Sequence, residues 1–328
     1  MGQAARSAHR ACQRRLWADL FSQHVCCLTL CNADTCSYRA LSSQKVTKVS
    51  NPAEYCVNLV RTYDYENYLC CLLLPKHVQR AVFAVRAFNV EIAQVRDVVS
   101  EKAIGAMRMQ FWKDFLGSLG KGVPPQTPVA VELSGATEYF KLPKRHFNNI
   151  IDARDQQLNK DGFSTVQELE KYAEVTASSL HYLTLACLGI QNVHADHAAS
   201  HIGKAQGLTT VLRAIPHHAQ RRRVYLPLDL ILKHKLSQED VMRGRSDQSV
   251  LDAVFDLAST ANTHLNTARS FTGDVPREAH VAFLNALPCD LYLQRLQAAN
   301  FNVFDPKLQV RVPSLPLRLW LQKIKKKY

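Results

Sequence analysis

The chain has 328 residues, 47% hydrophobic and 21% charged, a balance typical of globular proteins and unlike that of disordered or fibrous chains. Its net charge of +13 lies at the two ends: residues 1–50 hold seven Lys or Arg against two Asp, and residues 307–328 hold seven against none. Residues 51–306 are nearly neutral, which argues against a nucleic-acid-binding body and favours ends that serve targeting and an anionic membrane surface.

Residues 1–45 have the pattern of a mitochondrial transit peptide, because arginines accompany an apolar helical face and acids are few. The residues concerned are Arg6, Arg10, Arg14 and Arg15, with Leu16, Trp17, Leu20 and Phe21 on the face. A secretory signal is the alternative, but the apolar run at 25–31 is short and has polar neighbours. We expect removal of this segment near Arg39.

From about residue 50 the pattern is helical almost throughout. A long apolar face consists of Val78, Val82, Val85, Phe88 and Ile92, and two helix starts are expected at 164–168 and 237–240. Prolines punctuate the rest, and no repeat or composition break divides residues 50–306. The sequence therefore predicts one all-α domain. No apolar run reaches the roughly 18 residues of a spanning helix, so we expect at most a peripheral membrane protein.

Five of the ten cysteines lie in the expected leader, and the other five are scattered over apolar faces without a CxxC pair. A zinc or redox site needs convergent spacing that these residues lack. We therefore predict buried free thiols for Cys56, Cys70, Cys71, Cys187 and Cys289.

Three segments carry a family resemblance. The first is Asp64-Tyr-Glu-Asn-Tyr68 followed by Leu72-Leu-Leu-Pro75, the second is the stretch from His201 to Arg213, and the third is Arg221-Arg-Arg-Val-Tyr-Leu-Pro227. Their order and spacing over residues 55–300 resemble squalene and phytoene synthases. The resemblance implies a single-domain helical bundle of the isoprenoid synthase fold.

Synthases of this family couple prenyl diphosphates with Mg²⁺ held by two DxxxD motifs on facing helices, because Mg²⁺ requires hard oxygen ligands. The resemblance aligns the first motif with Ala93 to Asp97, and the second with Ala214 to His218. Three of the four carboxylates are then missing, and Pro216 should disturb the second helix. We expect a non-catalytic protein without a metal or another cofactor.

The wall of the family's prenyl channel is expected at 172–181, where small glycines align with Ser178 and His181, so that a histidine would narrow the channel. Residual prenyltransferase activity is an alternative. It would need other acids opposite Asp97, such as Glu91, Glu101 or Glu174.

Histidines at positions 194, 197 and 201 fall on one helical stripe, a spacing that could hold a transition metal. We favour a capped helix start there instead. A second set of polar residues could bind a diphosphate or a phospholipid headgroup, since guanidinium groups match phosphate oxygens. The alternative is a solvated basic turn. The set comprises Arg213, Arg221, Arg222, Arg223 and Tyr225.

The basic tail, residues 307–328, combines apolar residues at helical spacing with a lysine cluster. This suits an interfacial helix on an anionic leaflet, and the competing interpretation is a helix packed on the domain with solvated lysines. The candidate membrane contacts are Leu317, Trp320, Leu321, Ile324, Lys325, Lys326 and Lys327.

Within the family, residues 87–112 and 194–207 resemble the branch that serves in assembly of mitochondrial respiratory complex I. The resemblance implies an early role with membrane-arm subunits, on the matrix side of the inner membrane. The expected partners are complex I subunits or other assembly factors and the membrane surface, with no nucleic acid. A lipid- or isoprenoid-binding protein that uses an inherited cavity is the remaining alternative.

Overall fold

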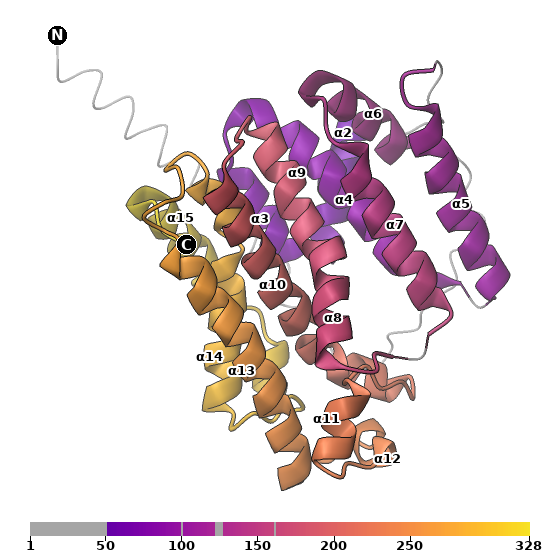
Figure 1. Ribbon diagram of the computed structural model, residues 1–328, viewed down its shortest axis with the longest axis vertical. Coiled ribbons are helices and arrows are strands. Elements are labelled where there is room, and N and C mark those ends of the chain that lie inside the picture. Colours follow the sequence, from indigo (N-terminus) through magenta and orange to yellow (C-terminus); the bar gives the residue numbers. More distant parts are fainter. Residues whose placement is uncertain (1–50, 100, 122–126, 161) are drawn as a thin grey trace, which may run out of the picture. The chain divides into compact units, whose positions relative to one another are not determined.

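Helices form all the regular secondary structure of the residues that the computed structural model describes, which are 51–99, 101–121, 127–160 and 162–328 (Figure 1). The expected transit peptide lies outside this part of the chain. The α-helices are α2 (Pro52–Tyr63), α3 (Tyr65–Leu73), α4 (Lys76–Val98), α5 (Lys102–Ser118), α6 (Pro128–Phe140), α7 (Lys144–Leu158), α8 (Val166–Ala173), α9 (Ser179–Cys187), α10 (Val193–Gln220), α11 (Leu228–Lys233), α12 (Gln238–Met242), α13 (Gln248–Ser270), α14 (Ala286–Ala298) and α15 (Leu315–Lys325). One π-helical turn, η1 (Glu174–Ser178), joins α8 to α9, and η2 (His280–Phe283) and η3 (Pro306–Gln309) are short 3₁₀ segments. The all-α prediction is confirmed.

Both predicted helix starts are present. At α8 the Thr165 hydroxyl accepts from the backbone N–H of Glu168 at 3.1 Å, while the Glu168 carboxylate accepts from the N–H of Ser164 at 2.7 Å. This reciprocal arrangement satisfies N–H groups that have no partner inside the helix. At α12 the Ser237 hydroxyl accepts from the N–H of Glu239.

Several prolines stand at helix starts, but one lies inside a helix. Pro75, Pro143 and Pro227 each stand immediately before a helix, whereas α10 continues through Pro216 to Gln220. The expectation that Pro216 would disturb this helix is therefore wrong, since the helix does not end at Pro216. It lies near the end of a 28-residue helix, so packing along the preceding turns supports the segment that contains it.

The N-terminal half packs around α4. The apolar face predicted for α4 is buried, and α4 packs against α2, α6 and α7. Phe88 lies at the centre, with its ring 4.9 Å from Trp112 of α5 and 5.3 Å from Phe147 of α7, both in edge-to-face contacts. Such pairs add to the free energy of burial itself.

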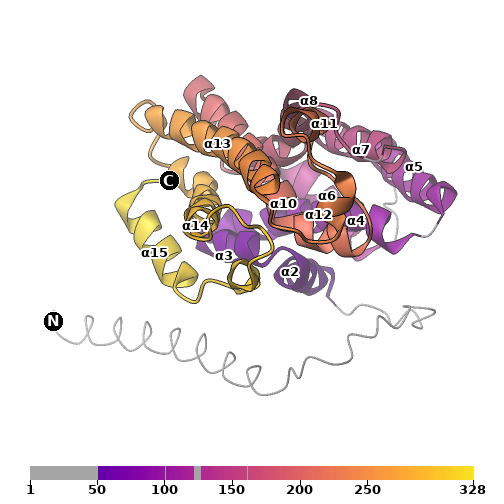
Figure 2. The same ribbon diagram turned by 90° about the horizontal axis from the view of Figure 1, so that it is seen from below.

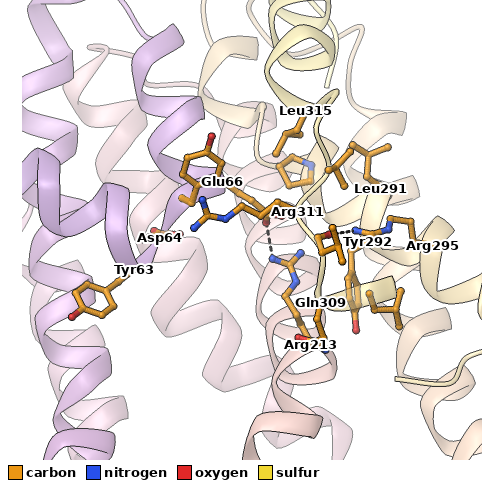
Figure 3. A pocket seen from close by; sticks show the side chains of 15 residues that line it. Tyr63, Asp64, Glu66, Arg213, Leu291, Tyr292, Arg295, Gln309, Arg311 and Leu315 are labelled. Atoms are coloured by element: carbon orange, nitrogen blue, oxygen red, sulfur yellow. Dashed lines mark hydrogen bonds and ion pairs between the residues drawn. The ribbon is translucent and has the colours of Figure 1, made fainter. Parts of the chain in front are cut away.

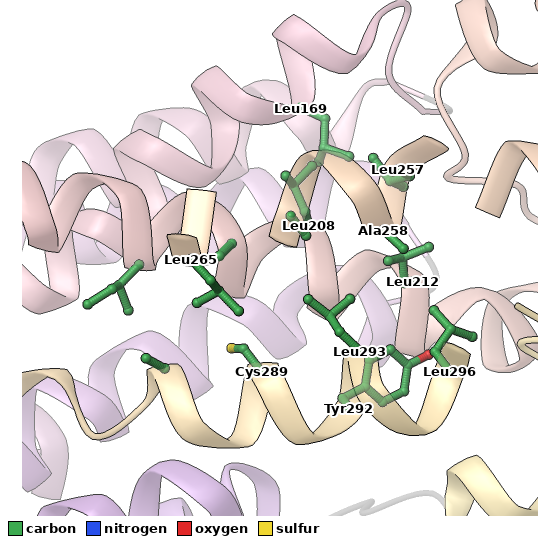
Figure 4. Packing of buried hydrophobic residues seen from close by; sticks show 14 of the residues in the cluster. Leu169, Leu208, Leu212, Leu257, Ala258, Leu265, Cys289, Tyr292, Leu293 and Leu296 are labelled. Atoms are coloured by element: carbon green, nitrogen blue, oxygen red, sulfur yellow. The ribbon is translucent and has the colours of Figure 1, made fainter. Parts of the chain in front are cut away.

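The C-terminal half packs around α10, which lies against α13 and α14 (Figures 1 and 2). Leucines from these three helices interdigitate in one apolar cluster (Figure 4). On its other side α10 contacts α8, η1 and α9, where Gly203 and Gly207 allow close approach. A β-carbon at Gly203 would overlap Ser178, and one at Gly207 would overlap Ala173.

The predicted buried thiols are confirmed. All five cysteines of the described residues are free and buried, and burial raises the pKa of Cys56, Cys71, Cys187 and Cys289 to about 12. They act as small apolar side chains.

The basic tail packs on the domain. Leu315 and Leu319 of α15 are buried against α3, and Tyr328 packs on His280 and Phe283. In the described part of the chain, no helix is both long enough and apolar enough to cross a bilayer.

Candidate functional site: a cavity between α4 and α10

A cavity of about 430 Å³ lies between α4 and α10, each of which lines it with residues about one helical turn apart. From α4 come Arg86, Asn89, Ala93 and Asp97, and from α10 come Gln206, Thr210, Ala214 and His218. The four positions that the resemblance aligned with metal ligands thus line one cavity. They are Ala93, Asp97, Ala214 and His218.

Two carboxylates line the cavity, and each has an arginine beside it. Asp97 Oδ1 accepts a hydrogen bond from Arg221 Nη1 at 2.9 Å, and Asp64 Oδ2 lies 3.8 Å from Arg86 Nη1. Burial raises the pKa of Asp64, and the positive charge of Arg86 opposes that shift.

Two further arginines add positive charge to the wall. Arg96 donates to the backbone carbonyls of Gln157 and Lys160 and lies over the ring of Tyr225, 4.9 Å from its centroid. Arg154 donates to Asn89 at 3.0 Å, and its Nε is buried without a protein partner.

These residues do not fit the Mg²⁺ ions on which synthases of this fold depend. Mg²⁺ binds hard oxygen ligands in an octahedron, usually including carboxylates. Here the two carboxylates are countered by guanidinium groups, and His218 stands where a second-motif ligand is expected. Burial lowers the pKa of His218 to about 4, so its ring is neutral at pH 7. Three arginines thus outnumber the two carboxylates on the wall.

None of the three acids that would have supported a rearranged metal site lines the cavity. Glu174 accepts from Ser178, Ser200 and Tyr182, and Glu101 is exposed at the start of α5. Glu91 is half-buried outside the lining, and burial raises its pKa to about 7.

The expected channel wall is displaced by one residue. Ala177 and Leu180 line the cavity, whereas Ser178 packs against Gly203 and His181 is fully buried, with its Nε2 3.0 Å from Gln206 Oε1. The predicted positions came from the family resemblance rather than from helical periodicity, and in this segment they are off by one residue. The predicted narrowing of the channel by His181 is wrong.

The five residues that we grouped as an anion site do not gather in one place. Tyr225 lines the cavity, and Arg221 reaches its edge through Asp97. Arg222 pairs with Glu239 at 3.3 Å, and Arg223 lies close to the phenol of Tyr225.

The fifth member, Arg213, faces elsewhere. It lines a second cavity of about 220 Å³, where it donates to Glu66 at 2.7 Å and lies over the ring of Tyr292 (Figure 3). Position 213 lies about 100° around α10 from position 214, which explains its separate direction.

The histidine stripe at the start of α10 packs on one aromatic ring. The ring centroids of His194, His197 and His201 lie 6.5, 5.8 and 6.4 Å from that of Phe271. Asn192 caps this helix by accepting from the N–H of Ala195, as the preferred interpretation required. Within the described residues no cluster of His, Cys, Asp or Glu is arranged to hold a metal.

Sequence reasoning missed the buried polar residues in the wall of the cavity. Asn67 accepts from Gln206 Nε2 at 3.3 Å and also from Asn285, so it links α3, α10 and the start of α14. Arg86 is the residue that the sequence could have revealed, since it interrupts the apolar run Phe83-Ala-Val-Arg-Ala-Phe88 on a buried helix.

A comparison with protein families assigns this architecture. The profile described as Squalene/phytoene synthase matches residues 60–317. The chain belongs to this family. Solved structures agree on the fold: a dehydrosqualene synthase in complex with ligand aligns with a TM-score of 0.73 at 19% identity, covering 84% of this chain and 95% of that one.

Relatives within the family carry two kinds of name. A Bos taurus protein named NADH dehydrogenase (ubiquinone) complex I, assembly factor 6 is 49% identical over 292 residues, covering 89% of this chain and 88% of its own length. A Synechocystis protein named 15-cis-phytoene synthase is 24% identical over 299 residues, covering 86% and 88% respectively. The chain is thus much more similar to the assembly factor than to the synthase.

Proposed function

We propose that this chain is a non-catalytic assembly factor for mitochondrial respiratory complex I. It acts early, on membrane-arm subunits, at the matrix side of the inner membrane. Its partners are complex I subunits or other assembly factors. The observation that carries the proposal is the 49% identity to an assembly factor over nearly the whole of both chains.

Conservation of that name across distant animals supports the assembly role. A Drosophila melanogaster relative, 42% identical over 278 residues, is named as a homologue of the same factor and covers 82% of each chain. The expected leader at residues 1–45 would bring the chain into the mitochondrion.

The chemistry of the cavity supports the absence of synthase activity. Ionisation of a prenyl diphosphate requires metal ions that neutralise the departing diphosphate. Arg221 holds Asp97, Ala93 and Ala214 offer no ligand atoms, and the ring of His218 is neutral. The fold then supplies a shaped helical body rather than a reaction centre.

The test is blue-native electrophoresis of complex I in cells that lack this protein, rescued with wild type or with Asp97→Ala. We expect the knockout to lose assembled complex I and both forms to restore it equally. Asp97 is about one-third exposed, so its removal leaves the fold intact and the comparison addresses chemistry.

Two outcomes would overturn parts of the proposal. Normal complex I in the knockout would exclude the assembly role. Rescue by wild type alone would mean that the carboxylate of Asp97 acts chemically. Purified chain incubated with Mg²⁺ and a prenyl diphosphate would then be assayed for released diphosphate, and we expect none.

A further inference from the structure

The C-terminal helix α15 has two apolar faces. Leu315 and Leu319 point into the domain and are 3% and 0% exposed. Leu317, Leu321 and Ile324 are 45%, 40% and 57% exposed, and their spacing of four and three residues places them on one stripe. That stripe lies roughly half a turn from the buried one, so it faces away from the domain. Trp320, 41% exposed, extends it.

Cations flank this outward face on both sides. On the helical repeat Arg318 and Lys325 fall on one flank and Lys323 falls on the other, and all three side chains are exposed. None of them forms an ion pair with a described residue, and residues 307–328 contain no Asp or Glu. Long basic side chains beside an apolar stripe can extend toward lipid phosphates while the stripe enters the acyl boundary.

A basic notch lies at the C-terminal end of the same helix. It has a volume of about 220 Å³. Its lining holds one carboxylate, that of Glu278, and four cationic side chains, those of Arg277, Lys323, Lys326 and Lys327. Leu73 and Val281 give it an apolar floor. A phosphodiester headgroup with its first acyl carbons matches this combination of charge and apolar surface.

The helix is held in the orientation that such a surface needs. It packs along α3 at the edge of the domain, where Figure 2 shows it outside α14. Tyr328 anchors the end of the chain: its ring packs on Phe283, 5.0 Å between centroids, and its hydroxyl donates to the carbonyl of Ala268. The outward stripe is therefore presented without any part of the domain unfolding.

From these observations we infer that α15 and the basic notch form a docking surface for anionic phospholipid bilayers. The helix lies flat in the interface, with Leu317, Trp320, Leu321 and Ile324 among the upper acyl carbons and the basic side chains at the phosphates. Charge complementarity selects this occupant, because the patch is apolar at its centre and cationic around it. The inference does not use the assembly role, so its test and the complex I test fail independently.

The test is flotation of the full chain with vesicles of phosphatidylcholine alone or with about 30% phosphatidylglycerol. We expect binding to the anionic vesicles only. The triple variant Leu317→Ser, Leu321→Ser, Ile324→Ser should weaken that binding about tenfold or more, because it removes the apolar stripe. Its matched control is Met107→Ser, Tyr139→Ser, Leu232→Ser, three exposed apolar residues elsewhere, and should bind like wild type.

A second pair of variants tests the charges. Lys323→Gln, Lys325→Gln, Lys327→Gln should weaken binding by roughly fivefold per lysine, and added salt should reduce the difference. Lys102→Gln, Lys121→Gln, Lys171→Gln removes the same charge from exposed positions elsewhere and should have little effect. All variants keep residues 1–50, so a contribution of that basic segment is the same in each.

Fluorescence locates the contact. In a Trp17→Phe chain the remaining tryptophans are buried Trp112 and exposed Trp320, so quenching by brominated anionic lipid reports on α15. Equal binding of the stripe variant and its control, or equal binding of wild type to both kinds of vesicle, would overturn the inference. No vesicle binding by wild type would overturn it too, and would assign the stripe to a protein partner.

Discussion

Asp97 of α4 and Arg221 at the end of α10 form an ion pair across the mouth of the central cavity, with Oδ1 and Nη1 2.9 Å apart. Asp97 is the single carboxylate left at the four positions that the family resemblance assigned to metal ligands. Its partner is a guanidinium group, so this carboxylate joins α4 directly to the end of α10.

This exposed pair should matter little for stability, in contrast to the buried pair of the same cavity. We expect Asp97→Ala to lower the free energy of unfolding by about 1 kcal/mol or less, because both side chains are about one-third exposed. Asp64→Ala should cost about 3 kcal/mol or more, since it leaves the guanidinium of Arg86 buried without its carboxylate. Urea unfolding of the two variants measures the difference, and equal losses would contradict this assignment.

The close approach of α10 to η1 predicts opposite effects of two glycine substitutions. Gly203→Ala should lower the free energy of unfolding by about 3 kcal/mol, because its β-carbon overlaps Ser178 and two packed backbones must separate. Gly135→Ala, in an exposed position of α6 with no atom nearby, should raise it by about 1 kcal/mol through helix propensity alone. Thermal unfolding followed by circular dichroism tests both, and a stabilised Gly203→Ala chain would refute the packing argument.

The sequence was sufficient for the elements whose cause is local. The apolar face of α4 repeats every three or four residues, and the capping residues Thr165 and Ser237 act within one turn, so both features could be read without tertiary information. Pro216 shows where local reasoning stops, because the contacts of a long helix outweigh one missing hydrogen bond.

The candidate site was only partly predictable for a related reason. Ala93, Asp97, Ala214 and His218 were placed by motif spacing on regular helices, where the face is determined by residue number. Ser178 and His181 were placed by the family resemblance alone, and their neighbours Ala177 and Leu180 line the cavity instead. The partners of Arg213 come from α3 and α14, which no local pattern connects to α10.

Buried histidines should make the fold sensitive to mild acid. Burial lowers the pKa of His181 to about 3 and that of His146 to about 4, so the folded chain keeps both rings neutral. The unfolded chain binds these protons near pH 6.5, so stability present above that pH is lost as the pH falls toward the folded-state values.

His181→Gln isolates one of these sites. Glutamine retains a polar contact for Gln206 but has no proton to gain. The free energy of unfolding of the wild type should fall more steeply between pH 6.5 and 5 than that of the variant, by at most about 1.4 kcal/mol per pH unit. Urea unfolding at intermediate pH values gives both slopes, and parallel slopes would mean that the pKa of His181 is the same in the folded and the unfolded chain.

The last residue should control the order of α15. Tyr328 is 4% exposed, packs on His280 and Phe283, and donates a weak hydrogen bond, 3.3 Å long, to Ala268. Tyr328→Ala removes the buried ring, so we expect the amides of α15 to exchange at least tenfold faster, roughly, while those of α10 keep their protection. Tyr328→Phe loses only the hydroxyl and should change exchange little. Faster exchange throughout α10 as well would show that the tail stabilises the whole domain, and unchanged exchange in α15 would show that Leu315 and Leu319 suffice to hold it.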